Sequence, residues 1–327
     1  MYTMDQTAPP LPADDRPGPG CTVDCSAAPF DLRPALDAIM TAENWILDRM
    51  PESRKLVIVF GECHSYQTHQ FLQQAVLLRH KEQAARDPQK SFAYGYEFEK
   101  KFWRRYPHNI DLHTEFATIQ WERGLNLEND YPEIYLSAYQ KLAKSHDLQG
   151  SQPLIALCQR EGISVSFNDA ASRINLESMR SIIDADDPQV RRIIAEHPAL
   201  PRGEMYSIGA DGMYLRNIAI AENAMEHIGQ TDAKIYIQHC GQDHVQGNPD
   251  RNMPYGQSLC AQFRQKNVDV LSVVFKCDSE QHRMHAPDVK QEAAHTLIIE
   301  NMAPALSAIY AYDHARRCVN QASGLNL

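Results

Sequence analysis

Two short stretches of the sequence place histidine and acidic side chains directly after apolar runs. Residues 56–60 are followed by Gly61-Glu62-Cys63-His64, and residues 234–238 by His239-Cys240-Gly241-Gln242-Asp243-His244. Imidazole and carboxylate groups transfer protons near neutral pH, and they are also common ligands of zinc, manganese and iron. The two stretches therefore predict either a metal-free acid–base site or a divalent-metal site with ligands drawn from His64, His239, Asp243 and His244.

These residue types suit hydrolysis of an ester, an amide or a similar bond. Glu62 or His64 is expected to activate water, and His244 to assist it or to help hold the metal. Glu62 needs a raised pKa to act as a base, which burial beside other carboxylates provides. Cys63 and Cys240 flank the histidines, but without the context of a nucleophile we interpret them as small apolar residues in tight turns.

Other charged residues occupy comparable positions elsewhere in the chain. Glu97 and Asp169 each come at the end of an apolar run, and Arg216 and Asn217 lie in the first turns of a helical pattern over residues 212–228. Arg216 is predicted to stabilise an oxyanion, or else to form a structural ion pair with Glu97 or Asp169. Asp169 and Asn217 are predicted to contact the substrate.

Five apolar runs must position these residues. The first of them, residues 56–60, lacks a polar alternation, which is typical of a parallel strand that is covered on both faces. Helical patterns lie between the five runs, so the sequence predicts an α/β fold with a mainly parallel central sheet flanked by helices. The carboxyl ends of such strands share one edge, where ligands bind. The predicted strands end at Phe60, Phe98, Phe167, Gln238 and Phe275.

The chain divides into a leader and one domain. Residues 1–30 are rich in proline and poor in apolar residues, which predicts a disordered leader before a single domain over 31–327. Residues of about 100–150 are aromatic and charged, and we interpret them as a helical insertion that covers the sheet edge. Trp103 in this insertion and Tyr66 are predicted to contact the substrate, although packing onto the core explains the aromatic residues of the insertion equally simply.

Composition excludes several classes of protein. A net charge of −10 argues against a nucleic-acid partner. No apolar run approaches the roughly 18 residues of a membrane span, and residues 1–30 do not have the pattern of a Sec signal peptide. The eight cysteines are scattered without a Cys-x-x-Cys pair, as in reduced cytoplasmic proteins.

The order of the motifs resembles a known superfamily. Gly61-Glu62-Cys63-His64, Glu97, Asp169, the helix beginning Arg216-Asn217, and Gly241-Gln242-Asp243-His244 are similar to the erythromycin-esterase-like, ChaN-like and TIKI/TraB superfamily. The resemblance covers roughly residues 50–275. It implies an α/β fold whose site at the sheet edge is built from Glu62, His64, Glu97, Arg216 and His244. Activities in the superfamily include lactone hydrolysis, metal-dependent peptide cleavage and haem binding.

Two classes of function follow from the resemblance. The first is a hydrolase of a small-molecule or peptide substrate, assisted or not by a divalent metal. The second is binding without turnover, either of haem through His64 or Tyr66 or of a host partner that recognises the protein as an effector. Because some bacterial effectors look similar and no Sec signal is evident, we expect a cytoplasmic protein or one delivered into a host cell by a specialised secretion system.

Overall fold

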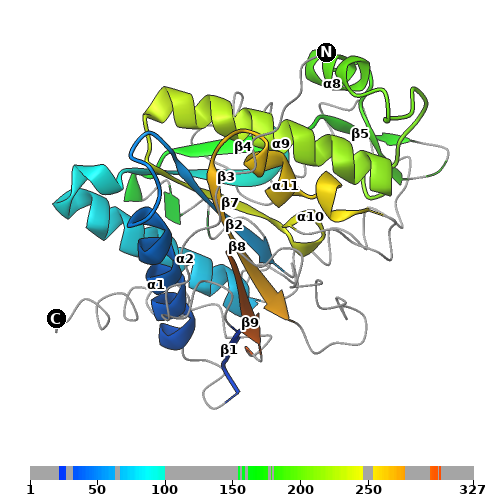
Figure 1. The fold of residues 1–327 in the computed structure, drawn as a ribbon. Coiled ribbons are helices and arrows are strands. Elements are labelled where there is room, and N and C mark those ends of the chain that lie inside the picture. The colour runs from blue at the N-terminus through cyan, green and yellow to red at the C-terminus, as the bar shows by residue number, and fades with distance from the viewer. Residues whose placement is uncertain are drawn as a thin grey trace, which may run out of the picture.

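A parallel sheet of seven strands forms the centre of the protein in the computed structural model (Figure 1). The structure describes residues 22–26, 32–62, 67–99, 154, 157–158, 161–175, 178, 180–245, 253–276, 295–300 and 302. The strands lie in the order β1-β9-β8-β2-β7-β3-β4, and every neighbouring pair is parallel. Their bounds are β1 Thr22–Asp24, β2 Leu56–Glu62, β3 Phe92–Glu99, β4 Val165–Asp169, β7 Ile235–Gly241, β8 Asp269–Lys276 and β9 Thr296–Glu300. The predicted α/β fold is confirmed.

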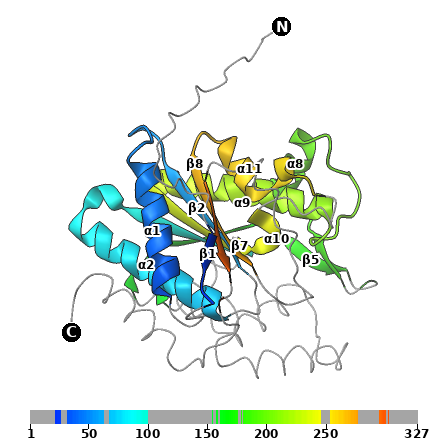
Figure 2. The same ribbon diagram turned by 60° about the horizontal axis from the view of Figure 1, so that its bottom comes forward.

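Helices cover both faces of this sheet. Helices α1 (Arg33–Leu47) and α2 (Gln67–Arg86) pack on one face, and α9 (Ala210–Thr231) and α11 (Leu259–Arg264) pack on the other (Figure 2). All seven residues of β2 are buried, as are all seven of β7. Side chains alternate between the faces along each strand, so a strand sandwiched between two helical layers needs apolar residues at consecutive positions.

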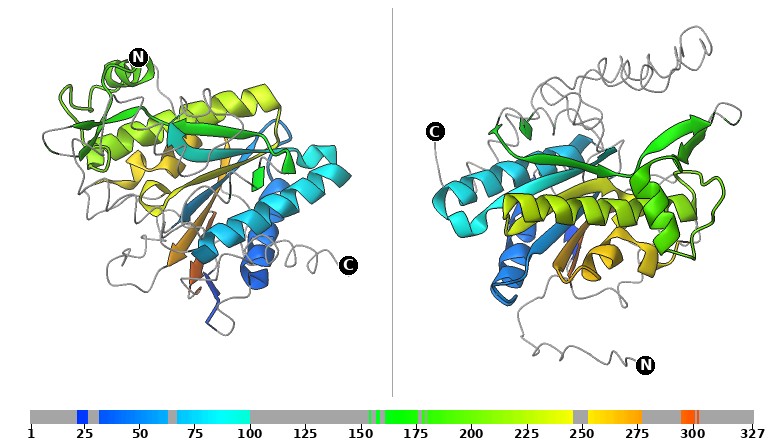
Figure 3. Two further views of the ribbon diagram at one scale, coloured as in Figure 1. Left: turned by 180° about the vertical axis from the view of Figure 1, so that it is seen from behind. Right: turned by 90° about the horizontal axis from the view of Figure 1, so that it is seen from above.

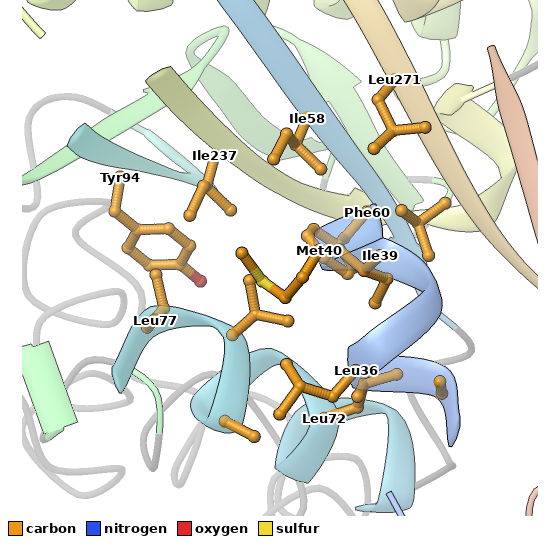
Figure 4. Packing of buried hydrophobic residues seen from close by; sticks show 14 of the residues in the cluster. Leu36, Ile39, Met40, Ile58, Phe60, Leu72, Leu77, Tyr94, Ile237 and Leu271 are labelled. Atoms are coloured by element: carbon orange, nitrogen blue, oxygen red, sulfur yellow. The ribbon is translucent and has the colours of Figure 1, made fainter. Parts of the chain in front are cut away.

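The larger apolar core lies between the sheet and the α1–α2 layer (Figure 4). Burial of each such side chain contributes roughly 1.5–3 kcal/mol to folding, which makes this layer the main support of the central strands. The residues drawn in Figure 4 include Leu36, Ile39 and Met40 of α1, Leu72 and Leu77 of α2, Ile58 and Phe60 of β2, and Tyr94, Ile237 and Leu271 of the neighbouring strands.

The strands run further than the apolar pattern predicts. Strand β2 ends at Glu62 rather than Phe60, and β4 ends at Asp169 rather than Phe167. Strand β7 ends at Gly241, so His239 and Cys240 lie within it and not in the loop that follows. The apolar pattern stops at the first polar residue, but the backbone pairing continues beyond it. Phe60, Gly61 and Glu62 pair with residues 239–241.

The sequence of residues 172–212, with prolines at 188, 198 and 201, predicts a mixed helical region, and the structure differs from this prediction. These residues hold an antiparallel hairpin, β5 (Ser172–Asn175) and β6 (Arg180–Ile183), followed by α8 (Pro188–Glu196). The hairpin and α8 lie together at one end of α9 (Figure 3). Asp187 caps α8 by accepting from the backbone N–H groups of Gln189 and Val190. The hairpin strands are short and partly exposed, and therefore carry no apolar pattern that predicts them.

Two further strands lie outside the predicted set. Strand β9 falls after about residue 288, where the sequence pattern predicts helices, and β1 falls within residues 1–30, which were predicted as a leader. These two strands pair with each other at one edge of the sheet. The predicted insertion at about 100–150 lies outside the described residues. None of the helices that the structure describes is long and apolar enough to span a membrane.

Candidate functional site

Charged side chains from three elements meet near the carboxyl ends of β3 and β4. Arg216, in the second turn of α9, contacts Asp169 at the end of β4 and Glu97 near the end of β3. His244 of α10 (Gln242–Val245) joins them through Glu97, and Asn217 joins through His244. We call these five residues, Glu97, Asp169, Arg216, Asn217 and His244, the Arg216 cluster.

Arg216 directs all five of its N–H groups at acceptors within the protein. Its Nε donates to Asp169 Oδ1 at 3.0 Å, and its Nη2 donates to Asp169 Oδ2 at 2.7 Å and also to Glu97 Oε1. Its Nη1 lies 3.4 Å from the Ser207 carbonyl oxygen and 3.5 Å from Met213 Sδ. The guanidinium therefore fixes two carboxylates, as the ion-pair alternative predicts. Because its N–H groups are already directed at acceptors of the protein, none is left to stabilise an oxyanion.

The charge of Arg216 is secured by its partners. Burial alone would lower its pKa, but the negative charges of Asp169 and Glu97 and the hydrogen bonds to them outweigh burial and raise the pKa above its ordinary value. The side chains of Arg216, Glu97 and Asp169 are 13%, 11% and 10% exposed. The cluster is therefore mostly desolvated.

His244 is held through both of its ring nitrogens. Nδ1 lies 2.6 Å from Asn217 Oδ1, and Nε2 lies 3.0 Å from Glu97 Oε1. The other oxygen of Glu97, Oε2, accepts from the backbone N–H of Gly241 at the end of β7. His244 is only 2% exposed, so Glu97 is the member of this pair that reaches the surface of the cluster.

A proton must lie between His244 Nε2 and Glu97 Oε1. Asn217 Nδ2 donates to the backbone carbonyl of Gln257 at 2.9 Å, which turns the amide oxygen of Asn217 toward His244. His244 Nδ1 then carries a hydrogen, because an amide oxygen only accepts. An unprotonated Nε2 facing a carboxylate oxygen would set two lone pairs against each other, so the proton of this contact sits on one atom or the other.

Gly61 explains how α10 comes close enough to supply His244. A Cβ at this position would lie 2.4 Å from Val245 Cγ2 and 3.2 Å from Gln242 Cα. Only glycine lets α10 pack directly on the end of β2. The glycine of the first motif therefore serves the histidine of the second, a link that the sequence pattern alone does not reveal.

A second carboxylate–imidazole pair lies on the opposite face of the sheet. Glu62 Oε1 is 2.8 Å from His239 Nε2, although the ring is not aligned for a hydrogen bond, and both side chains are essentially inaccessible to solvent. Gln73 of α2 donates to Glu62 Oε2 at 3.3 Å, and the Tyr96 ring lies 4.4 Å from that of His239. This burial favours a structural pair and removes Glu62 from the expected contact with water.

A buried polar network lies beneath α9, beside the cluster. Asn168 Nδ2 donates to Tyr236 Oη at 2.9 Å and to Gln238 Oε1 at 2.7 Å, and its carbonyl accepts from Asn223 of α9. A Cβ on Gly95 would lie 2.3 Å from Asn168 Nδ2, so this glycine makes room for the network. The network fixes α9 against the strand that bears Asp169. Sequence reasoning missed it, since single polar residues within apolar runs gave no signal.

The remaining predicted site residues divide into two groups. His64, Tyr66 and Trp103 lie outside the described residues, as does Cys63. Asp243 is half-buried on α10, and Cys240 is buried with Sγ 3.6 Å from the Phe60 carbonyl oxygen. Burial raises the pKa of the Cys240 thiol well above its usual range, which fits a small apolar residue and not a nucleophile.

The predicted metal ligands do not form a centre within the described part of the chain. His239 pairs with Glu62 on one face, while His244 has both ring nitrogens in contact with Asn217 and Glu97. Among the described residues, no group of three or more His, Cys, Asp and Glu side chains is arranged to hold a metal ion. A metal held with the help of His64 therefore stays a prediction, and His244 is not one of its ligands in this arrangement.

The fold and the cluster define an α/β protein with a polar, charged cluster at the carboxyl edge of a parallel sheet. The sequence matches no known family and no curated protein. The chain is similar to a solved structure described as that of the type III effector HopBA1. The sequences are 16% identical, the alignment covers 81% of this chain and 93% of that chain, and the TM-score is 0.33. The superfamily suggested by the motifs stays a resemblance.

Proposed function

We propose that this protein is a hydrolase of an ester, amide or similar bond, and that Glu97 and His244 form its proton-donating pair. Hydrolysis requires a proton for the leaving group when the bond to the carbonyl carbon breaks. Glu97 lies at the surface of the cluster and donates the proton to the leaving group. His244 lies behind Glu97 and supplies that proton to it. The observation that supports this assignment is the 3.0 Å distance between His244 Nε2 and Glu97 Oε1, at which a proton on either atom can pass to the other.

In the proposed reaction, one proton leaves the attacking water and one proton reaches the leaving group. Water attacks the carbonyl carbon and gives a proton to a base, for which His64 is the remaining predicted residue. The tetrahedral intermediate collapses, the bond to the leaving group breaks, and the leaving oxygen or nitrogen takes a proton from Glu97. This is the single proton of the His244–Glu97 contact, which reaches Glu97 from His244 Nε2 where it rests on the ring, and the proton taken by the base then restores it.

Arg216 takes a positioning role in this proposal. Its hydrogen bonds to Asp169 and Glu97 hold the Glu97 carboxylate in place and balance the charges of the cluster. This differs from the oxyanion-stabilising role expected from the sequence, because its N–H groups are already directed at acceptors of the chain. Stabilisation of the oxyanion then falls to groups other than Arg216.

A panel of p-nitrophenyl esters, p-nitroanilides and short peptides tests the proposal. We expect Glu97→Gln and His244→Gln to lower kcat on any substrate that the native protein cleaves by roughly 100-fold or more, the range of general acid catalysis. Glu222→Gln is the matched control, because Glu222 is a carboxylate on α9 that pairs with Arg192 away from the cluster. A Glu97→Gln protein with native kcat, correctly folded by circular dichroism, contradicts the assignment.

Binding without turnover is the other proposal that the sequence leaves open. A Soret band on haem titration, lost when His64 is replaced by Ala, favours haem binding, whereas turnover lost in Glu97→Gln favours the hydrolase. Delivery into a host cell and recognition by a host partner stay predictions.

A further inference from the structure

Asn217 occupies a position from which it controls the protonation of His244. Its side chain is fully buried between the backbone carbonyl of Gln257 and the ring of His244. Gln257 belongs to a short 3-10 turn, η3 (Tyr255–Gln257), that lies against α11. The sequence had suggested that Asn217 contacts substrate, but both ends of its amide are engaged within the protein.

The carbonyl of Gln257 fixes the orientation of the Asn217 amide, and the amide in turn fixes which nitrogen of His244 carries a hydrogen. A carbonyl oxygen can only accept, so Gln257 fixes the Asn217 NH₂ group on its own side. The Asn217 oxygen must then face His244 Nδ1 and accept from it at 2.6 Å. The carbonyl of Gln257 thereby determines, through one amide, that Nδ1 is the protonated nitrogen of His244.

This arrangement changes the number of protons that the Glu97–His244 pair holds. With no acceptor at Nδ1, a neutral ring protonated only at Nε2 satisfies the Glu97 carboxylate with a single proton. Because Asn217 accepts a hydrogen bond from Nδ1, the first proton of the ring lies on Nδ1. A second proton is then needed between His244 Nε2 and Glu97 Oε1. We propose that Asn217 is a positioning residue that, by accepting from Nδ1, loads the pair with the extra proton it passes to the leaving group. The inference rests on the proposed function for the use of that proton, but not for its presence.

Two substitutions at one position separate the acceptor from the rest of the contact. Asn217→Leu and Asn217→Asp both lose the donor to Gln257, but only Asp keeps an oxygen that accepts from Nδ1. Asn223→Leu is the matched control, because Asn223 is a second buried amide on α9 whose partners, Asn168 and Gln189, lie away from His244. Any general effect of removing a buried amide from this helix appears in the control as well.

Long-range ¹H–¹⁵N correlation of the histidine rings gives the direct test. The signals of His244 among the 14 histidines are identified by their loss in His244→Gln. We expect Nδ1 to be protonated in the native protein, in Asn217→Asp and in Asn223→Leu, and unprotonated with a hydrogen on Nε2 in Asn217→Leu. An unprotonated Nδ1 in the native protein overturns the inference even if no variant folds. A protonated Nδ1 in folded Asn217→Leu overturns it too.

Kinetics distinguish a failure of this inference from a failure of the proposed function. On a substrate whose cleavage depends on Glu97, Asn217→Leu is expected to lower kcat at least tenfold with little change in KM, whereas Asn217→Asp keeps most of the native kcat. Equal kcat losses in both variants overturn the role of the acceptor. If the native protein cleaves no member of the panel, the hydrolase proposal and the use of the proton fail together, and the ring spectra still decide whether Asn217 sets the protonation of His244.

Discussion

Replacement of Arg216 by Met should destabilise the protein far more than replacement of Arg192 by Met. Each arginine contacts two carboxylates, Arg216 those of Asp169 and Glu97, and Arg192 those of Glu196 and Glu222. They differ in burial, because the Arg216 side chain is 13% exposed and that of Arg192 is 45% exposed. The two substitutions therefore isolate the effect of desolvation on an otherwise similar arrangement of charges.

The expected magnitudes follow from what each change leaves behind. Removing one partner of a buried pair costs roughly 3–5 kcal/mol, and the exposed tenth of these carboxylates places Arg216→Met near the lower value. An exposed ion pair contributes only about 0–1 kcal/mol, which bounds the loss in Arg192→Met. Asp169→Asn added to Arg216→Met should recover part of the loss, because it removes one of two carboxylates that are left facing each other without a cation.

Urea denaturation followed by circular dichroism measures these differences as changes in the free energy of unfolding, compared at equal slope with denaturant. Losses of similar size in Arg216→Met and Arg192→Met would refute the reasoning, since burial would then make no difference. A double variant that is less stable than Arg216→Met would also refute it, because the carboxylates would not be repelling each other.

Two further predictions concern packing and pH. Gly61→Ala should cost roughly 1–3 kcal/mol by overpacking against Val245, and Val245→Ala should relieve part of this in a double-mutant cycle, while Gly229→Ala, where nothing lies within 4 Å, should be neutral or stabilising. His69 is stacked on Phe275, and burial lowers its pKa from 6.5 to about 3 although Glu62 opposes this. The unfolded chain therefore takes up a proton that the folded protein resists, so stability present above pH 6.5 is lost as the pH falls toward 3. His69→Phe should lose less stability than the native protein between pH 7 and pH 5 in denaturation midpoints, and equal losses would contradict this.

The sequence predicts the sheet and the edge at which its polar residues gather, because buried parallel strands require continuous apolar runs. It also predicts the meeting of Glu97, Asp169 and Arg216, since helix starts and strand ends share one edge. The sequence does not predict which of the polar residues at that edge contact one another. Glu62 and His239 were expected beside the other charged residues, but alternation along β2 and β7 directs them to the α2 face.

The face of the sheet to which a side chain points is fixed only where the strand extends to that residue, and the apolar pattern underestimates the length of β7. His239 was assigned to a loop, where its direction is undetermined, whereas its place within β7 sets its face. The hairpin strands β5 and β6 are short, as are β1 and β9, and the pairing of β1 and β9 depends on neighbours distant in the sequence. Single-sequence patterns carry no information about such neighbours, and the same is true of the amide of Asn217, whose role depends on the carbonyl of Gln257.

The position of β7 has a consequence for how the chain reaches its fold. This strand is made late, yet it lies between β2 and β3, and it pairs residues 235–241 with β2 and residues 235–239 with β3. Until it emerges from the ribosome, β2 has neither of its neighbours, since β8 follows later still, and the pair β3–β4 cannot join the rest of the sheet. Contacts so distant in sequence close slowly and leave apolar strand edges open in the meantime. We therefore expect nascent chains that end before residue 235 to aggregate or to engage chaperones, and folding of the sheet to begin only once β7 is available.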